Sequence, residues 1–239
     1  MQSPDARGLS IPVDAAQRVS GLFLVPAGAR VCYVLAHGAG AGMTHPFMET
    51  VAQGLAQRDI ATLRYQFPYM ERGSRRPDVP KVAHAAVRAA VSEAARLAPG
   101  LPLAAGGKSF GGRMTSQAQA AAPLPGVRGL AFLGFPLHAA GKPSDERGRH
   151  LFNVQVPMLF VQGAADKLAD PLLVEPLIEQ LRDRRTAEGG PVLAVPRATL
   201  HLIPDADHSF HVPARSGRKD SEVMAEMLNA LAAWLVTLR

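Results

Sequence analysis

Short apolar runs alternate with helical patterns along most of the chain. Val31–Ala36 is a continuous apolar run of strand length, as expected of a strand buried on both faces of a parallel sheet. Further strands are predicted at Ile60–Tyr65, Leu101–Ala105, Arg128–Phe135, Pro157–Gln162 and Ala198–Ile203. Helices are predicted at Phe47–Gln57, at Val79–Leu97, from Ser109 to about Ala121, at Pro171–Arg184 and at Ser221–Leu238. This order indicates an α/β protein with a mostly parallel sheet and helices on both faces.

Two segments precede this pattern and another interrupts it. Gly8–Val13 and Ser20–Val25 have the character of short strands, which we expect to pair in antiparallel fashion at one edge of the sheet. The segment Pro136–Gln155 is rich in Gly, Pro and charge and is too short to form a separate lid domain. A site at the sheet edge should therefore be fairly open, with the irregular loops Pro68–Pro80 and His211–Asp220 at its border.

The composition favours a single globular domain over residues 1–239. The chain has 239 residues, of which 47% are hydrophobic, together with 22 Gly and 20 Pro. This suits a substantial core joined by many tight turns. Trp234 falls on the apolar face of the last predicted helix, so we expect it in the core. Cys32 is the lone cysteine and has apolar neighbours, which predicts a buried thiol and excludes a disulfide within the chain.

The net charge of +6 and the pI of about 10.0 raise the question of a nucleic-acid or anionic-lipid partner. The basic residues form small separate clusters, namely Arg72/Arg75/Arg76, Arg182/Arg184/Arg185 and Arg215/Arg218/Lys219. Because no cluster follows one helix face with interleaved aromatic residues, we expect a solvated surface and no nucleic-acid partner. The N-terminus lacks an apolar signal core, and no apolar run approaches the roughly 20 residues that cross a bilayer. We therefore expect no membrane partner and a cytoplasmic, reducing location.

One pentapeptide supplies a candidate nucleophile. Gly107-Lys108-Ser109-Phe110-Gly111 matches G-x-S-x-G and lies where a predicted strand meets a predicted helix, the context that this motif requires. The turn is so sharp that bulky side chains two residues either side of the serine would clash, so glycines stand there and the hydroxyl is raised above the sheet. Ser109 is the predicted nucleophile, and its alternative interpretation is an ordinary helix N-cap.

A serine nucleophile needs a base, and His208 is the best placed of the 8 histidines. It follows the last predicted strand, so its loop can bring the imidazole over the nucleophile at the carboxyl edge of the sheet. His211, a little further along the chain, is the nearest rival. The other histidines on loops after predicted strands are expected to line the pocket or to have a structural role: His37, His45 and His138.

The imidazole must be held in one tautomer, so a carboxylate is expected at the end of another strand. Asp166 stands just past the predicted strand Pro157–Gln162 and lies between Ser109 and His208 in the chain. The order Ser, Asp, His is that of α/β-hydrolases. Asp170 is the fallback, but as the residue before Pro171 it fits a helix cap better.

Acyl transfer also needs donors for an oxyanion, normally the N–H after the nucleophile and one from an early strand-to-helix loop. The N–H of Phe110 is the first expected donor, and Ala39 in the Gly-rich run 37–42 is the second. Gly40 and Lys108 are expected to line the pocket. The Gly-rich run lacks the Gly-Lys-Ser/Thr ending of a phosphate loop and the G-x-G-x-x-G spacing. Since no Cys/His or His/Glu pair has ligand spacing, we expect no metal and no cofactor.

Four segments together resemble the α/β-hydrolase superfamily over nearly the whole chain: His37–Gly40, Gly107–Gly111, Gly163–Asp166 and Asp207–Phe210. More narrowly, the chain is similar to the small lidless hydrolases related to dienelactone hydrolase. Within them it resembles the bacterial group similar to the hydrolase-like subunit of an animal histone-acetyltransferase complex. This closer resemblance is carried by Arg64–Glu71 and Gly106–Met114. Dienelactone hydrolase itself has a cysteine nucleophile, so dienelactone activity proper is not implied for a chain with Ser109.

The resemblance implies a carboxylesterase-like serine hydrolase that cleaves a small ester or related acyl bond through an acyl-enzyme on Ser109, with Asp166 and His208 as its partners. It supplies no substrate, and ester, thioester and peptide bonds stay open. Lys108 and Arg113 beside the nucleophile indicate a positive potential suited to acidic substrates. The alternative is a non-catalytic interaction module that has kept the fold. In either case we expect a monomer or homodimer.

Overall fold

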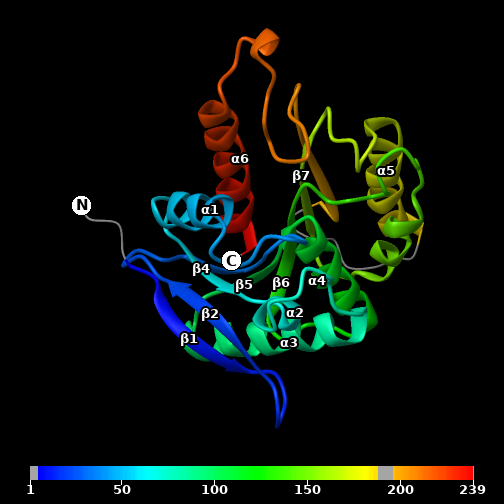
Figure 1. Cartoon of the computed structure of the whole chain (residues 1–239). Helices are drawn as coiled ribbons and strands as arrows, with labels where there is room; N and C mark the ends of the chain where they lie inside the picture. Colours follow the sequence, from blue (N-terminus) through cyan, green and yellow to red (C-terminus); the bar gives the residue numbers. More distant parts are fainter. Residues whose placement is uncertain (1–4, 188–195, 239) are drawn as a thin grey trace.

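The computed structural model describes residues 5–187 and 196–238, and its strands follow the apolar runs of the sequence (Figure 1). The strands are β1 (Arg7–Pro12), β2 (Arg18–Leu24), β3 (Val31–Ala36), β4 (Ile60–Tyr65), β5 (Leu103–Lys108), β6 (Val127–Leu133), β7 (Met158–Gly163) and β8 (Ala198–Ile203). They form an 8-stranded sheet in the order β1-β2-β4-β3-β5-β6-β7-β8. Pairing is parallel from β4 across to β8, and β1 and β2 add an antiparallel edge. This confirms the predicted sheet and its antiparallel pair.

Helices cover both faces of the sheet. They are α1 (Pro46–Ala56), α2 (Pro68–Glu71), α3 (Pro80–Leu97), α4 (Phe110–Ala121), α5 (Pro171–Ala187) and α6 (Asp220–Leu235), with 3₁₀ turns η1 (Glu146–Asn153), η2 (Ala214–Ser216) and η3 (Val236–Leu238). In Figure 1, α1 and α6 lie together on one face, and their apolar residues pack against alternate side chains of β3 such as Val31 and Leu35. The opposite face of β3, with Cys32 and Val34, belongs to the core layer under α3, α4 and α5.

The C-terminal helix owes its apolar character to this packing. Among the described residues, Asp220–Leu238 is the one segment with the length and mean hydropathy, 1.2, of a membrane-crossing helix. Its side chains Met227, Leu231 and Trp234 lie in the core layer shared with α1. Trp234 is only 7% exposed, which confirms its predicted place in the core. Cys32 is also buried as predicted, and burial raises the pKa of its thiol to about 12.

Strand β5 extends further than its apolar residues indicate. It continues to Lys108 because Gly106 and Gly107 still pair with β3 and β6. A Cβ atom on Gly106 would lie 1.8 Å from the carbonyl oxygen of Ala131, so only glycine allows the strands to approach this closely. The strand predicted from the apolar residues ends at Ala105, because glycine has no apolar side chain to mark the continuation.

Three short elements lie in segments that were predicted to be irregular. Pro68 opens α2 inside the loop Pro68–Pro80, η1 occupies part of Pro136–Gln155 and packs against α4, and η2 lies within His211–Asp220. Such short helical segments bury too few residues to leave a periodic pattern, so sequence reasoning missed all three. No separate lid domain occurs between β6 and β7 in the described part of the chain.

Candidate active site

Ser109 stands between β5 and α4 in a strained backbone conformation. Its φ is 49° and its ψ is −114°, a region that residues other than glycine rarely adopt. Such strain persists only where the surrounding structure maintains it, and it is concentrated at functional sites. Ser109 occupies the N-cap position of α4, yet its side chain makes no capping hydrogen bond. This argues against the interpretation of Ser109 as an ordinary helix cap.

The glycines around Ser109 let separate segments of main chain approach one another. A Cβ atom on Gly107 would lie 2.2 Å from the carbonyl oxygen of Ala36. One on Gly111 would lie 2.5 Å from the carbonyl oxygen of His37. Both distances are far inside van der Waals contact, so a larger residue at either position would push the strands and the turn apart. The glycines of the pentapeptide are therefore needed for the turn that presents the serine.

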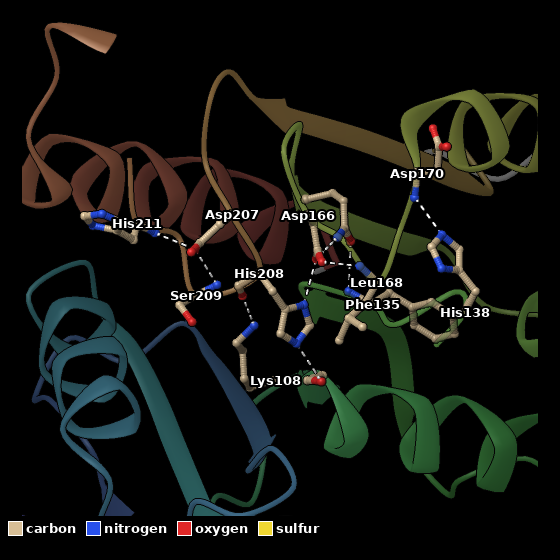
Figure 2. Close-up of polar contacts among 12 residues, drawn as sticks. Lys108, Phe135, His138, Asp166, Leu168, Asp170, Asp207, His208, Ser209 and His211 are labelled. Carbon is tan, nitrogen blue, oxygen red and sulfur yellow. Dashed lines mark hydrogen bonds and ion pairs between the residues drawn. The ribbon is translucent and has the colours of Figure 1, made fainter. Parts of the chain in front are cut away.

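Three side chains from separate loops form one hydrogen-bonded line at the carboxyl edge of the sheet. Ser109 follows β5, Asp166 follows β7 and His208 follows β8. Nε2 of His208 lies 2.9 Å from the hydroxyl oxygen of Ser109. Nδ1 of His208 lies 2.7 Å from Oδ2 of Asp166, and a dashed line marks this hydrogen bond in Figure 2. The structure thus brings together the predicted nucleophile, base and carboxylate.

The surroundings of Asp166 indicate which ring nitrogen of His208 carries the proton. The side chain of Asp166 is 0% exposed, and an ionised carboxylate only accepts hydrogen bonds. We therefore place a proton on Nδ1 of His208, which donates to Asp166. Nε2 is then free to accept the hydroxyl proton of Ser109, as a base for this nucleophile must.

Two further groups hold Asp166, and sequence reasoning missed both. Nε2 of Gln162 donates to Oδ2 at 2.5 Å, and the N–H of Leu168 donates to Oδ1 at 2.8 Å (Figure 2). Gln162 is 1% exposed, and its Oε1 accepts a hydrogen bond from the N–H of Phe135 at 2.8 Å. The signal that could have found it is a glutamine in an otherwise apolar strand, because a buried amide requires partners.

Asp170 and His211, the alternatives for the carboxylate and the base, have other roles in the structure. Asp170 accepts a hydrogen bond from the N–H of Leu172 at 3.0 Å at the start of α5, as the cap interpretation predicted. His211 is exposed and pairs with Asp220 at 2.8 Å, and this hydrogen bond raises the pKa of His211. Figure 2 shows His211 on the far side of Asp207 from the ring of His208.

His37 does not line a pocket and has a structural role, which was the alternative expectation from the sequence. Its side chain is fully buried, its Nδ1 donates to the carbonyl oxygen of Gly38 at 2.8 Å, and its Nε2 accepts the N–H of Phe67 at 3.0 Å. Burial lowers the pKa of His37 to about 4, so the ring is neutral near pH 7. His37 ties the loop after β3 to the loop after β4. The reason is that the N–H of Phe67 is buried beside it and needs an acceptor.

The other strand-loop histidines also have identifiable contacts. His138 is 4% exposed, and its Nε2 accepts the N–H of Asp170 at 3.0 Å, a structural role that Figure 2 shows. Nδ1 of His45 accepts the N–H of Phe47 at 3.2 Å and so caps α1. His45 in addition lines a cavity beside Ser109.

Lys108 connects the nucleophile turn to the histidine loop. Its Nζ donates a hydrogen bond to the carbonyl oxygen of His208 (Figure 2). The ammonium lies 5.8 Å from the ring centre of Phe47 and 5.1 Å from that of Phe210, within the range of cation–π attraction. Burial lowers the pKa of Lys108 to about 8, although the charges of Asp166 and Asp207 act in the opposite direction.

The two predicted oxyanion donors lie beside the serine. Phe110 is the first residue of α4, so its N–H has no acceptor inside the helix. Ala39 lines the cavities on both sides of Ser109. A Cβ atom on the neighbouring Gly38 would lie 3.7 Å from the Cβ of Ser109, which places this loop in contact with the nucleophile. Gly40 is exposed and is not among the residues that line either cavity.

Two cavities meet at Ser109. The first, of about 350 Å³, extends over Phe110 and includes Arg113 and Arg147 in its wall. The second, of about 310 Å³, is lined by Lys108, His208 and apolar residues. A compound with a reactive carbonyl at Ser109 therefore has room for one part on each side. Within the described residues, no group of three or more His, Cys, Asp or Glu side chains is arranged to hold a metal ion.

The sheet order, the strained turn and the line of side chains define an α/β-hydrolase. A family model described as an alpha/beta hydrolase domain matches residues 29–236. Since this is most of the chain, the protein belongs to that family. The predicted fold class, without a large lid domain, is thereby confirmed.

Solved structures share this fold over nearly their full lengths. A dienelactone hydrolase from Anabaena variabilis has a TM-score of 0.73 and 20% identity, with 99% of each chain covered. A serine hydrolase without a lid from Xanthomonas campestris has a TM-score of 0.69 and 21% identity, with 97% of this chain and 95% of that chain covered. A cold-adapted esterase from an Arctic intertidal metagenomic library has a TM-score of 0.65 and 21% identity, with coverages of 98% and 96%. At these identities, the likeness concerns the fold.

Proposed function

We propose that the protein is a serine hydrolase that cleaves a small ester or a related acyl bond through an acyl-enzyme. The observation that carries the proposal is the line from Ser109 through His208 to buried Asp166, with atom distances of 2.9 Å and 2.7 Å. These are the distances that a nucleophile and a base need for proton transfer. The strained backbone of Ser109 adds support, since an interaction module has no use for it.

The proposed reaction has two halves. Nε2 of His208 takes the hydroxyl proton while Oγ of Ser109 attacks the carbonyl carbon, and the N–H groups of Phe110 and Ala39 hold the oxyanion. His208 then gives its proton to the leaving oxygen, and the acyl group remains on Ser109. A water molecule repeats the sequence and releases the acid. Asp166 steadies the imidazolium in both halves.

Ester turnover and covalent labelling test this proposal. Purified protein should release p-nitrophenol from short p-nitrophenyl esters and should gain the mass of one fluorophosphonate adduct per chain. Ser109→Ala should abolish labelling and lower kcat by several orders of magnitude. Ser92→Ala, at an exposed serine on α3, should behave like the wild type. A folded wild-type sample that neither reacts with the probe nor turns over any ester would refute the proposal.

Several finer expectations stay predictions. The interaction module is the rival function, and a pull-down that finds a partner together with an absence of ester turnover would favour it. Three other predictions need separate tests. They are the resemblance to a subunit of an animal histone-acetyltransferase complex, the cytoplasmic location, and the choice between monomer and homodimer. The same holds for the expected absence of a cofactor, a nucleic-acid partner or a membrane partner.

A further inference from the structure

Two guanidinium groups line the cavity that extends over Phe110. Arg113 belongs to the first turn of α4, and Arg147 belongs to η1, which packs against that helix. In the part of the chain that the structure describes, no ion pair or side-chain hydrogen bond is formed by either guanidinium. Nε of Arg113 is buried and has no hydrogen-bond partner. Two cations without partners therefore face the space next to the nucleophile.

This arrangement costs stability unless an anion binds there. Burial and the positive charge of Arg147 lower the pKa of Arg113, so the two charges are close enough to repel each other. The carboxylate in the same wall belongs to Asp78, which is already engaged. It pairs with Arg72 at 2.6 Å and accepts the N–H of Tyr69 at 2.7 Å. Two partly buried cations without a counter-charge are typical of a binding site for an anionic group.

The position of His208 indicates which half of the substrate enters this cavity. His208 lines the second cavity, together with Lys108 and Phe47, and is not part of the wall around Arg113. The leaving oxygen must receive its proton from Nε2 of His208, so the leaving group is expected on that side. The acyl group then extends over Phe110 toward the two arginines.

We propose that the preferred substrates are half-esters of short dicarboxylic acids, with the free carboxylate of the acyl group bound by Arg113 and Arg147. The proposal rests on the proposed serine-hydrolase function and deepens it. Guanidinium groups match a carboxylate by paired N–H donors, and the cavity of about 350 Å³ suits an acyl chain of a few carbons. In the reaction, the bond between the acyl carbon and the leaving oxygen breaks, and the free dicarboxylate is released when water cleaves the acyl-enzyme.

Matched esters with one leaving group test the charge preference. Mono-4-nitrophenyl glutarate carries the free carboxylate, and methyl 4-nitrophenyl glutarate has the same acyl chain with that charge removed. The free carboxylate also attacks its own ester and releases p-nitrophenol without enzyme, so this rate is measured and subtracted. The enzyme-dependent release should be faster for the charged ester, with kcat/KM higher by about tenfold or more. Arg113→Met and Arg147→Met should each lower kcat/KM for the charged ester about tenfold to a hundredfold, chiefly through KM. The loss should be smaller for the neutral ester, so the preference for the charged ester should fall by about tenfold.

Arg149→Met is the matched control, because Arg149 lies on the same η1 turn but is 73% exposed and is not part of the cavity wall. It should leave both esters unaffected. Equal rates for the two wild-type esters, or equal losses in the arginine variants, would overturn the proposal while active-site labelling still supported the hydrolase. If an ester with its carboxylate on the leaving group, 4-carboxyphenyl butyrate, is the one that depends on the arginines, the acyl assignment is wrong.

A measurement on the wild type keeps the test valid if a variant fails to fold. Glutarate should slow the labelling of Ser109 by a fluorophosphonate, whereas neutral glutaramide should not. Equal protection by both compounds, or none by either, would contradict an anion site in this cavity. Failure of labelling altogether would instead count against the hydrolase function itself.

Discussion

Ser109 holds a backbone conformation that costs on the order of 1–3 kcal/mol for a residue other than glycine. The cost is borne by the contacts that fix the turn on both sides. The N–H of Ser109 donates to the carbonyl oxygen of Leu133 at 3.1 Å, and its carbonyl oxygen accepts the N–H of Arg113 at 3.1 Å. The hydroxyl is thereby directed away from the helix and toward His208 rather than into a cap. The strained backbone of Ser109 thus places its hydroxyl where the proposed reaction requires it.

Lys108 lines the pocket as predicted, but its contact with the main chain of His208 was not expected. Its ammonium lies near the stacked rings of Phe47 and Phe210, whose centres are 6.0 Å apart, and donates to the carbonyl oxygen of His208. The residue before the nucleophile therefore holds the main chain of the base. We regard Lys108 as a positioning residue, because its contact is with the backbone of His208.

Lys108→Met tests this role. The variant keeps the length of the side chain but loses the donor, so kcat should fall about tenfold while KM changes by less than about threefold. Because the pKa of Lys108 is lowered from 10.5 to about 8, the unfolded chain binds more protons than the folded chain between these values. The wild type should therefore gain stability relative to the variant as the pH rises from about 8 to 10.5.

Kinetics on p-nitrophenyl esters and denaturant unfolding at several pH values would check both parts. Lys81→Met, at an exposed lysine on α3, is the control and should show neither effect. An unchanged kcat, together with a stability difference that does not vary with pH, would refute the role given to Lys108.

At the level of strands and loops, the site consists of residues that directly follow the ends of parallel strands. Parallel strands β5, β7 and β8 finish at the same edge of the sheet, so residues just past them converge even though they are far apart in the chain. This is why Ser109, Asp166 and His208 could be predicted to meet from the G-x-S-x-G motif, the order of the three residues and their places after apolar runs. The alternation of strands and helices along the chain likewise allowed the parallel sheet to be predicted.

What could not be predicted depends on contacts between distant main-chain groups. His37 could be placed on a loop after a strand, but its acceptor role depends on the N–H of Phe67, which comes from another loop. Gln162 could be placed in a buried strand, but its bond to Asp166 depends on the path of the chain after β7. Arg147 lies on a 3₁₀ turn that has no periodic pattern, so its place beside Arg113 came only from the structure.

His37→Ala tests the tie between the loops after β3 and β4. At pH 7 the variant should lose about 1–3 kcal/mol of unfolding free energy, because the buried N–H of Phe67 loses its acceptor. The pKa of His37 is lowered from 6.5 to about 4, so the unfolded chain binds the extra proton between these values. The stability that His37 contributes should therefore diminish as the pH falls from about 6.5 to 4.

Chemical denaturation of wild type and variant across this range gives the difference directly. His211→Ala, at an exposed histidine whose pKa is raised by its hydrogen bond to Asp220, is the contrast, because the stability that it contributes should not diminish as the pH falls. A difference that stays constant, or that grows as the pH falls, would contradict the neutral buried acceptor.

The whole molecule combines a sheet covered on both faces with cavities at its carboxyl edge. Helices on both faces fill two apolar layers, which leaves the carboxyl edge of the sheet for the loops that carry the site. The wall of one cavity at this edge carries two arginines and that of the other carries Lys108 with aromatic residues. We therefore assign a function only to the basic side chains that border Ser109, and not to the basic residues elsewhere on the surface. The proposed chemistry depends on cooperation between this serine and the imidazole of His208.

The rate at which a fluorophosphonate modifies Ser109, followed by intact mass in wild type, His208→Ala and His211→Ala, measures that cooperation. The wild type and His211→Ala should react at rates within about threefold of each other, and His208→Ala should react slower by orders of magnitude. If His208→Ala, correctly folded, is modified at Ser109 as fast as the wild type, His208 is not the base and the mechanism is wrong.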